Sequence, residues 1–224
     1  MACRPDIIGR TGLAFFGAMS SSNFHEINNA LAIINENAGL LGDLIHMADN
    51  GSEMDLDTLG RVSDRIIDQV GRTKEIVRTI NRFSHSVENP EKRVDLGETV
   101  VFVANLAHRF ALMNGVGIST KLPPAPVKIT TSPFFLENLV WLCLDFAMKV
   151  AGDEKKITLS IELVENKGLV RFSSLNRLTP ELFKAFKNQD ELAILDALDA
   201  QITADPEKKE ILVILPARFT RHCP

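Results

Sequence analysis

The chain has 224 residues, which is enough for one large domain or two small ones. Hydrophobic residues make up 45% and charged residues 24%, a composition that excludes disordered, collagen-like and low-complexity proteins. The formal net charge of −4 argues against nucleic-acid binding, because such proteins usually carry an excess of basic side chains. No apolar run is long enough for a membrane helix. The short apolar stretch from Gly12 to Met19 follows charged residues, which argues against a signal peptide.

The three cysteines, Cys3, Cys143 and Cys223, are odd in number and far apart in the sequence. Their spacing fits neither a disulfide framework nor a zinc site, so we expect free thiols and no metal. A reducing, cytoplasmic location follows as the expectation.

The chain changes character near residue 90. The segment 86–93 is polar and contains Pro90, which is typical of a linker. Before it the pattern is helical, and after it come most of the prolines and several alternating β-branched runs. We therefore expect two domains, residues 1–90 and residues 91–224.

The first part predicts an antiparallel helical hairpin. Its apolar residues recur at three-, four- and seven-residue intervals, and the residues from Asp49 to Ser52 are typical of a turn. The first stripe consists of Phe24, Ile27, Leu31, Ile34, Leu41, Leu44 and Ile45, and the second of Met54, Leu59, Val62, Ile66, Val70, Ile76, Ile80 and Phe83. A lone hairpin leaves apolar surface on its outer side, so we expect a homodimer that forms a four-helix bundle.

The second part predicts an α/β arrangement. We expect helices over residues 98–113, 134–150, from 179 onward and over 190–199, and strands over 116–120, 127–130, 157–163, 169–172 and 211–215. Ser132 is a candidate cap for the second of these helices, and Pro133 suits its first turn. That helix is apolar nearly all round, so it should be buried. The strands 157–163 and 169–172 should form a hairpin. The fold class is therefore α+β.

The segment Phe24–Ile34, with His25 and Glu26 followed by Asn29, Ala30 and Leu31, resembles the phospho-acceptor H-box of two-component sensor histidine kinases. The hairpin around it is similar to that family's dimerization and histidine phosphotransfer domain. Val94-Asp95-Leu96 resembles the opening of the family's ATP-binding domain, and the expected order of elements after it is that of the Bergerat-type ATPase fold. The resemblance covers roughly residues 15–216.

The second domain departs from the family where ATP would bind. By alignment, Phe146 stands where the family has the asparagine that holds Mg²⁺. Residues 172–177 replace the Asp-x-Gly-x-Gly motif, and no glycine follows Gly168. Glycine-rich loops let the backbone approach phosphates closely. We therefore expect a degenerate ATPase-type α/β sandwich that uses neither ATP nor another cofactor. This architecture resembles that of the dimeric histidine phosphotransferases.

The resemblance implies that His25 is a phospho-acceptor and that the partner is a response-regulator receiver domain. A phosphohistidine relay needs an exposed imidazole with one unprotonated nitrogen. Glu26 is adjacent and is a candidate to orient or deprotonate the ring, while Asn29 lies one turn on along the same face. A turn near Gly51 would bring residue 25 opposite about residue 78. Arg78 and Arg82 are then candidates to neutralise phosphate, or simply solvated partners of acidic residues.

The sequence is compatible with four other interpretations. His25 has the residue type of an ordinary surface histidine. Glu26 and Asn29 would also suit a phosphatase that positions water against a receiver's aspartyl phosphate. A non-catalytic pseudokinase scaffold would bind a regulator without chemistry, and an active histidine kinase is the least favoured alternative.

Overall fold

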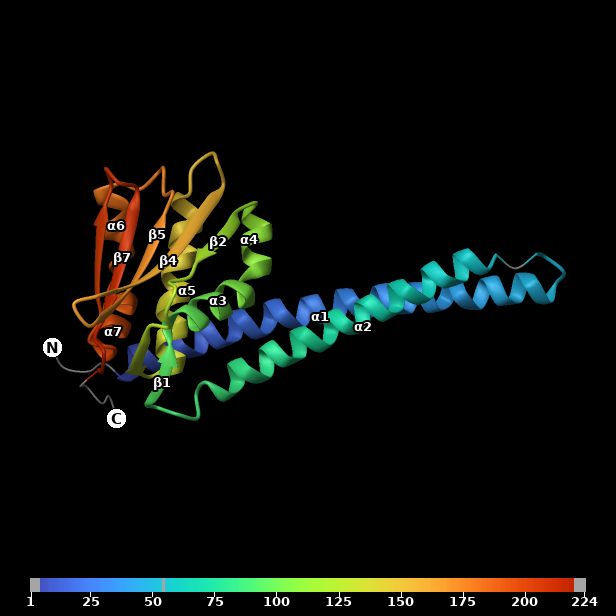
Figure 1. Cartoon of the computed structure of the whole chain (residues 1–224), viewed down its shortest axis with the longest axis horizontal. Coiled ribbons are helices and arrows are strands. Elements are labelled where there is room, and N and C mark those ends of the chain that lie inside the picture. Colours follow the sequence, from blue (N-terminus) through green and yellow to red (C-terminus); the bar gives the residue numbers. More distant parts are fainter. Residues whose placement is uncertain (1–4, 54, 220–224) are drawn as a thin grey trace. The chain divides into compact units, whose positions relative to one another are not determined.

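The computed structural model describes residues 5–53 and 55–219, so Cys3, Met54, His222 and Cys223 lie outside it (Figure 1). The helices are α1 Pro5–Asp49, α2 Leu56–His85, α3 Leu96–Leu106, α4 His108–Asn114, α5 Pro133–Val150, α6 Pro180–Phe186 and α7 Gln189–Ala197. The strands are β1 Lys92–Asp95, β2 Gly117–Lys121, β3 Lys128–Thr131, β4 Lys156–Val164, β5 Lys167–Ser173, β6 Gln201–Asp205 and β7 Glu210–Leu215. This is the predicted helical hairpin followed by an α/β sheet domain, which confirms the α+β class.

By their contacts, residues 20–82 form one compact unit, and the residues up to 19 together with those from 83 onward form the other. The first unit contains most of the hairpin and is called the hairpin unit below. The second contains the sheet together with the first turns of α1, and is called the α/β unit. A functional boundary at residue 90 stays a prediction.

The hairpin unit consists of two antiparallel helices, as the apolar stripes predict. Gly51 has a φ of +90° in the turn, a value that glycine adopts without strain. The side chain of Asp55 accepts a hydrogen bond from the amide of Asp57 at 3.0 Å and another from the Thr58 hydroxyl at 2.5 Å, which orders the start of α2. The bond to Thr58 holds the pKa of the Asp55 carboxyl below its usual value.

Each helix of this unit carries two rows of side chains at seven-residue spacing, called seams below. Along α1 the side chains of Asn23, Ala30 and Asn37 are buried at seven-residue steps, which is the seam facing α2. A second set at the same spacing, Phe24, Leu31 and Ile45, remains exposed. On α2, Val62 and Ile76 are buried while Val70 and Val77 are exposed. The hairpin therefore buries one seam and leaves the other open.

The α/β unit is built on a five-stranded sheet in the order β2-β4-β5-β7-β6 (Figure 1). The pair β2–β4 is parallel and the other three pairs are antiparallel. A separate antiparallel pair joins β1 to β3. The buried face of the sheet carries Ile157, Leu159, Val170, Phe172 and Val213, which join one core cluster with the buried residues of α3, α5 and α7.

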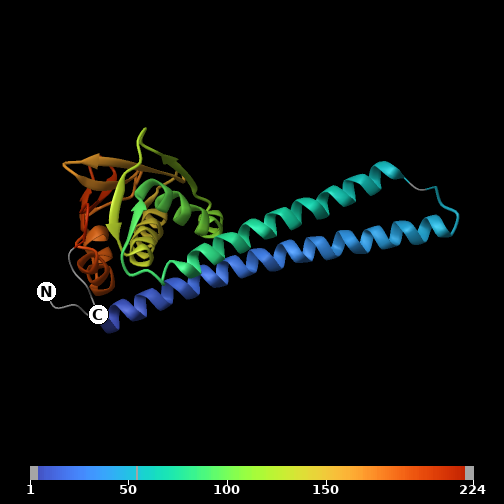
Figure 2. The same cartoon turned by 60° about the horizontal axis from the view of Figure 1, so that its bottom comes forward.

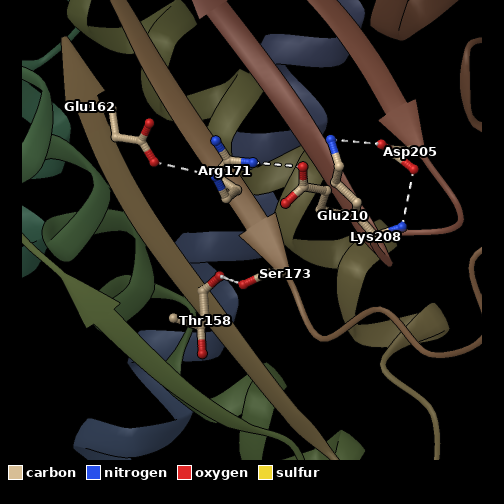
Figure 3. Close-up of polar contacts among 7 residues, drawn as sticks. All are labelled: Thr158, Glu162, Arg171, Ser173, Asp205, Lys208 and Glu210. Carbon is tan, nitrogen blue, oxygen red and sulfur yellow. Dashed lines mark hydrogen bonds and ion pairs between the residues drawn. The ribbon is translucent and has the colours of Figure 1, made fainter.

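The β4–β5 hairpin follows from strict alternation of apolar and polar residues. Its two-residue turn, Glu165 and Asn166, has φ values of 49° and 61°, as two-residue hairpin turns require. On the other face of the sheet, Arg171 donates to Glu162 at 3.3 Å and to Glu210 at 2.6 Å (Figure 3). The bond to Glu210 raises the pKa of the Arg171 guanidinium. These polar side chains make the outer face of the sheet a network of hydrogen bonds.

Several local expectations were wrong in detail. The helix expected over 98–113 is two helices, because Ala107 has φ −89° and ψ 4° and leaves the helical region. Ser132 occupies the N-cap position of α5, with Pro133 following, but its side chain makes no capping hydrogen bond. Strands β1 and β6 were not expected, and Lys92 and Arg93 belong to β1 rather than to a linker. Both strands are short and carry few apolar residues.

The first turns of α1 belong to the α/β unit through a cluster of aromatic rings. Phe83, at the end of α2, lies with its ring centroid 5.1 Å from that of Phe15 and 6.1 Å from that of Phe134 on α5. Phe16 stacks on Phe83 at 5.3 Å. Gly12 faces the same ring of Phe134, and a Cβ there would lie 3.0 Å from it. We call Phe15, Phe16, Phe83 and Phe134 the aromatic cluster.

Truncation within the aromatic cluster should destabilise the α/β unit. Phe15 is 2% exposed, so Phe15→Ala should lower the free energy of unfolding by about 3 kcal/mol through lost burial and the cavity left behind. Leu13, two residues away and 74% exposed, is the matched control, and Leu13→Ala should change it by less than about 0.5 kcal/mol. Urea unfolding of the two variants measures the difference, and equal effects would show that α1 is not anchored here.

A buried acidic residue sits at the start of α7. Glu191 is 8% exposed, and one of its carboxyl oxygens is shielded from solvent with no hydrogen-bond partner among the described residues. Burial raises the pKa of this carboxyl above its usual value. The thiol of Cys143 on α5 is fully buried, and burial together with the charge of Glu191 raises its pKa as well. Cys143 is a free thiol, as expected.

Glu191 should therefore make the α/β unit less stable as the pH rises. Because its pKa is higher in the folded than in the unfolded chain, its contribution is fully favourable below the unfolded value and is lost as the pH rises through the folded value. Glu191→Gln should raise the stability at neutral pH and flatten this part of the pH dependence. Glu207→Gln, at an exposed position, is the control and should change neither. Thermal unfolding between about pH 4 and pH 8 measures both effects.

Candidate functional site

His25 lies near the middle of α1, within the hairpin unit. Its side chain is exposed, and no hydrogen bond or ion pair joins it to another residue of the described ranges 5–53 and 55–219. The helix is unbroken on both sides, so the imidazole projects from a rigid backbone. An exposed ring on a rigid helix is accessible to a reactive group brought by another protein.

Asn29 follows one turn further along the same face and is also exposed. An amide at this position is able to donate a hydrogen bond to an oxygen of a group attached to, or approaching, His25. Ala30, next to it in the sequence, is buried against α2 and adds no bulk beside the ring. The structure therefore presents His25 and Asn29 together on one open face of α1.

Glu26 points elsewhere, because neighbouring residues of a helix are separated by about 100° around its axis. Its side chain is only 16% exposed and accepts a hydrogen bond from the Arg72 guanidinium of α2 at 3.3 Å. The structure thus brings Glu26 to α2 and not to the outer face with His25. Its placement favours a role in holding the two helices together over one in deprotonating the ring.

Arg72 is the arginine that lies level with the site, and the expectation of Arg78 and Arg82 there was wrong. They follow about 9 and 15 Å further along α2. Arg78 forms an exposed ion pair with Glu75 on its own helix, which agrees with the other alternative, a solvated partner of an acidic residue. The expected register assumed helices that reach the turn together. Instead, α1 has more residues than α2 between the Glu26–Arg72 pair and the turn, and it extends beyond the start of α2 (Figure 2).

Arg72 was not singled out from the sequence. The signal that could have found it is the seven-residue periodicity of both helices, which fixes the register once one buried pair is known. Its guanidinium is half exposed, so part of it is available at the surface beside Glu26.

Aromatic side chains pack around Phe146, the residue that the sequence resemblance aligns with the metal-binding asparagine of the kinases. Phe146 on α5, at the position aligned with the metal-binding asparagine, stacks on Phe186 of α6 with ring centroids 4.6 Å apart. Phe183 continues the stack at 6.3 Å from Phe186. Leu175, in the segment that replaces the glycine motif, is fully buried. Aromatic packing thus occupies the position where the family places a metal-holding amide.

Comparison with known proteins gives similar folds but no sequence relative. No family model and no curated protein matches the chain. Among solved structures it is similar to the histidine kinase AdeS of Acinetobacter baumannii, with 14% identity and a TM-score of 0.48 over 81% of this chain and 95% of that one. It is also similar to the catalytic domain of the histidine kinase ThkA, with 14% identity and a TM-score of 0.48 over 58% and 99% of the two chains.

A third similar structure is the mycobacterial sensor histidine kinase MprB, with 14% identity and a TM-score of 0.46 over 58% of this chain and 99% of that one. At this identity the likeness concerns the fold alone and does not bear on the chemistry of His25. Within the part of the chain that the structure describes, no helix is both long and apolar enough to cross a membrane.

The Glu26–Arg72 pair gives a direct test of the hairpin register. A double-mutant cycle with Glu26→Gln and Arg72→Gln should give a coupling of about 0.5 kcal/mol in the free energy of unfolding, since Arg72 is half exposed. The same cycle with Arg78→Gln in place of Arg72→Gln should give none. Coupling to Arg78 rather than Arg72 would restore the register expected from the sequence.

Proposed function

We propose that this protein is a histidine phosphotransfer protein of a two-component phosphorelay. His25 exchanges a phosphoryl group with the receiver domains of response regulators, without using ATP. The observation that carries the proposal is the exposed His25 on a rigid helix, inside an H-box sequence and with Asn29 beside it. The expected setting is the cytoplasm, where Cys143 stays reduced.

The chemistry needs little from this chain. The unprotonated ring nitrogen of His25 attacks the phosphorus of the receiver's aspartyl phosphate, an N–P bond forms, and the P–O bond to the carboxylate breaks. The aspartate leaves as a carboxylate and the proton on the other ring nitrogen passes to water. Asn29 donates to a phosphoryl oxygen, and the receiver's own acidic cluster supplies the Mg²⁺ that such a transfer uses. The reverse steps pass the group to a second receiver.

Two features of the α/β unit favour a relay over a kinase. The Phe146–Phe186 stack takes the place of a metal-holding amide, and no glycine after Gly168 is present to form a phosphate loop. The α/β unit then acts as a scaffold. A response-regulator phosphatase is the second candidate, because the exposed amide of Asn29 is equally suited to hold a water molecule against a receiver's aspartyl phosphate.

We further propose that the protein is a homodimer. The second seam of the hairpin unit exposes Phe24, Leu31 and Ile45 on α1 and Val70 and Val77 on α2, at the seven-residue spacing of a helical bundle. A second copy of the same hairpin would cover this seam and complete a four-helix bundle. His25 lies outside the seam, so both copies would keep their histidines open.

Transfer of label from a receiver tests the proposed function. Receiver domains from the same genome, phosphorylated with labelled acetyl phosphate, should lose label to the wild-type protein and none to His25→Ala. The product should be labile in acid and stable in base, as a phosphoramidate is. Asn29→Ala should slow the transfer by about tenfold if the amide stabilises the phosphoryl group in the transition state.

Two results would replace this proposal. If wild type and His25→Ala drain the receiver equally without becoming labelled, and Asn29→Ala does not, the protein is a phosphatase. Labelling of His25 by Mg-ATP alone would make it a kinase.

The dimer is tested by light scattering. The wild type should have the mass of two chains at micromolar concentration, because a seam of this length buries enough apolar surface for a persistent dimer. Leu31→Glu, in the exposed seam, should weaken the dimer while the hairpin still forms. A control, Ala32→Glu, places the same charge next to it outside the seam and should leave the mass unchanged. A wild-type monomer would refute the dimer.

A further inference from the structure

The strand β2 forms one edge of the five-stranded sheet in the α/β unit (Figure 1). Within the described part of the chain it pairs only with β4, in parallel register from Gly117 beside Lys156 to Lys121 beside Ser160. Four of its five residues are exposed and Ile118 is half-buried, so its other side is open. We call the open side of residues 117–121 the β2 edge. The proposed phosphotransfer does not use it.

The register fixes which backbone groups of β2 point to the open side. In a parallel pair, alternate residues direct both their N–H and their C=O groups toward the neighbouring strand. The amide of Gly117 donates to the backbone oxygen of Lys155 at 2.7 Å, so residues 117, 119 and 121 face β4. The backbone groups of Ile118 and Thr120 face the other way and form no hydrogen bond with the described residues. The β2 edge therefore offers two donors and two acceptors in strand geometry.

Two lysines without an acidic partner lie on the outer face of the sheet beside the β2 edge. Lys121 ends β2, and Lys156 begins β4 opposite Gly117. Both lysines are exposed, and neither forms an ion pair with another described residue. Because Gly117 has no side chain, nothing of β2 stands between the Lys156 ammonium group and the edge. The acidic residue on this face of β4, Glu162, is paired with Arg171 at 3.3 Å (Figure 3).

Exposed apolar side chains lie at both ends of the β2 edge. Leu112 and Met113, in the last turn of α4, are 61% and 72% exposed. The turn from α4 into β2 is short, since the amide of Val116 donates to the backbone oxygen of Ala111 at 2.8 Å, and α4 contacts β2. Leu122, directly after β2, is 58% exposed. A strand added at this edge would find apolar surface at each end.

We propose that the β2 edge binds an extended, acidic segment of another protein, which joins the sheet as an additional strand. The backbone of the segment pairs with the N–H and C=O groups of Ile118 and Thr120, so that main-chain hydrogen bonds give the affinity. Side chains of an extended segment alternate between two faces. Two acidic side chains four residues apart on the outer face match Lys121 and Lys156, which are about 13 Å apart along the strands. Apolar side chains on the inner face contact the apolar residues at the ends of the edge.

Charge argues against a second copy of this chain as the occupant. Two β2 strands paired antiparallel about Ser119 would bring Lys121 of one copy opposite Gly117 of the other. Lys121 would then lie next to Lys156 of that other copy, and like charges brought together across strands lower stability. The β2 edge is therefore complementary to an acidic segment and not to itself.

A synthetic peptide tests the β2 edge on the full chain. The capped peptide Glu-Val-Thr-Ile-Glu-Val has two glutamates four residues apart on one face and apolar residues on the other. In an NMR titration it should bind with a Kd below about 1 mM. Amide hydrogen exchange at Ile118 and Thr120 should slow by about tenfold when about nine-tenths of the sites are occupied. The peptide Lys-Val-Thr-Ile-Lys-Val has the same pattern with the opposite charge and should not bind.

Variants of Thr120 test the backbone pairing. Thr120→Pro removes an N–H that points to the open side and leaves the hydrogen bonds to β4 in place. It should unfold within a few degrees of the wild-type midpoint and bind the glutamate peptide at least about tenfold more weakly. Thr120→Val changes the side chain but keeps the N–H, so it should bind the peptide as the wild type does.

A charge exchange at Lys121 tests the recognition of acidic residues and does not depend on the proline variant. Lys121→Glu should weaken binding of the glutamate peptide by about tenfold and bind the lysine peptide more tightly than the wild type does. Lys167→Glu makes the same change at an exposed position of β5, which is not a neighbour of β2. It lies beyond a Debye length of about 10 Å and should alter binding less than about twofold.

Four results would overturn the proposal. The first is the absence of protection of Ile118 and Thr120 at millimolar glutamate peptide, whether or not the peptide binds elsewhere. The second is binding to Thr120→Pro at the wild-type level. The third is equal weakening by Lys121→Glu and Lys167→Glu, because general attraction would then explain the binding. The fourth is a Thr120→Pro variant with half the wild-type mass in light scattering, because a second copy would then occupy the edge.

Discussion

The contacts of Phe83 tie the start of α1 and the end of α2 to the rest of the α/β unit. Phe83 is the last large apolar residue of α2, and its ring packs against Phe15 and Phe16 of α1 and Phe134 of α5. Pairs of this kind add about 0.5–1.5 kcal/mol each beyond the apolar area they bury. This cluster ties the start of α1 and the end of α2 to α5, together with Ile8 and Met19 of α1, which join the same core. The ion pair of Arg10 with Asp190 is too exposed to replace it.

Some residues of the hairpin contribute to both seams, the one between α1 and α2 and the exposed one. Ile34 and Leu41 lie between the buried and the exposed positions of α1, so they contribute to both seams. The interior seam also contains polar residues, Asn23 and Asn37, where a stability optimum would place leucine or isoleucine. Polar residues at such positions lower stability and favour one pairing over its alternatives. The remaining side of α1, which carries His25 and Asn29, belongs to neither seam and is exposed.

Helices and strands with a long, regular hydrophobic pattern were predictable from the sequence, and elements with a short or irregular pattern were not. The two hairpin helices, the buried α5 and the β4–β5 pair all carry long, regular patterns, and the structure has them where the patterns place them. The break between α3 and α4 depends on the backbone conformation of Ala107, and alanine gives no sequence signal for the end of a helix. Strands β1 and β6 owe their form to the partners they pair with rather than to their own residues. The motif identified His25, Glu26 and Asn29 from the sequence. Only the register between α1 and α2 shows that Glu26 faces α2, away from His25 and Asn29, and that Arg72 is its partner.

The anchoring of α1 in the α/β unit affects how the chain folds during its synthesis. Arg10 meets a residue 180 positions later in the sequence, and Phe15 meets a helix that begins at Pro133. During synthesis the first turns of α1 are therefore made long before their partners leave the ribosome. Contacts so distant in sequence form slowly, and the apolar residues that wait for them are exposed to aggregation meanwhile. Phe15, Phe16 and Met19 form such a segment, so this part of α1 stays open to aggregation until the end of α2 and α5 have been made.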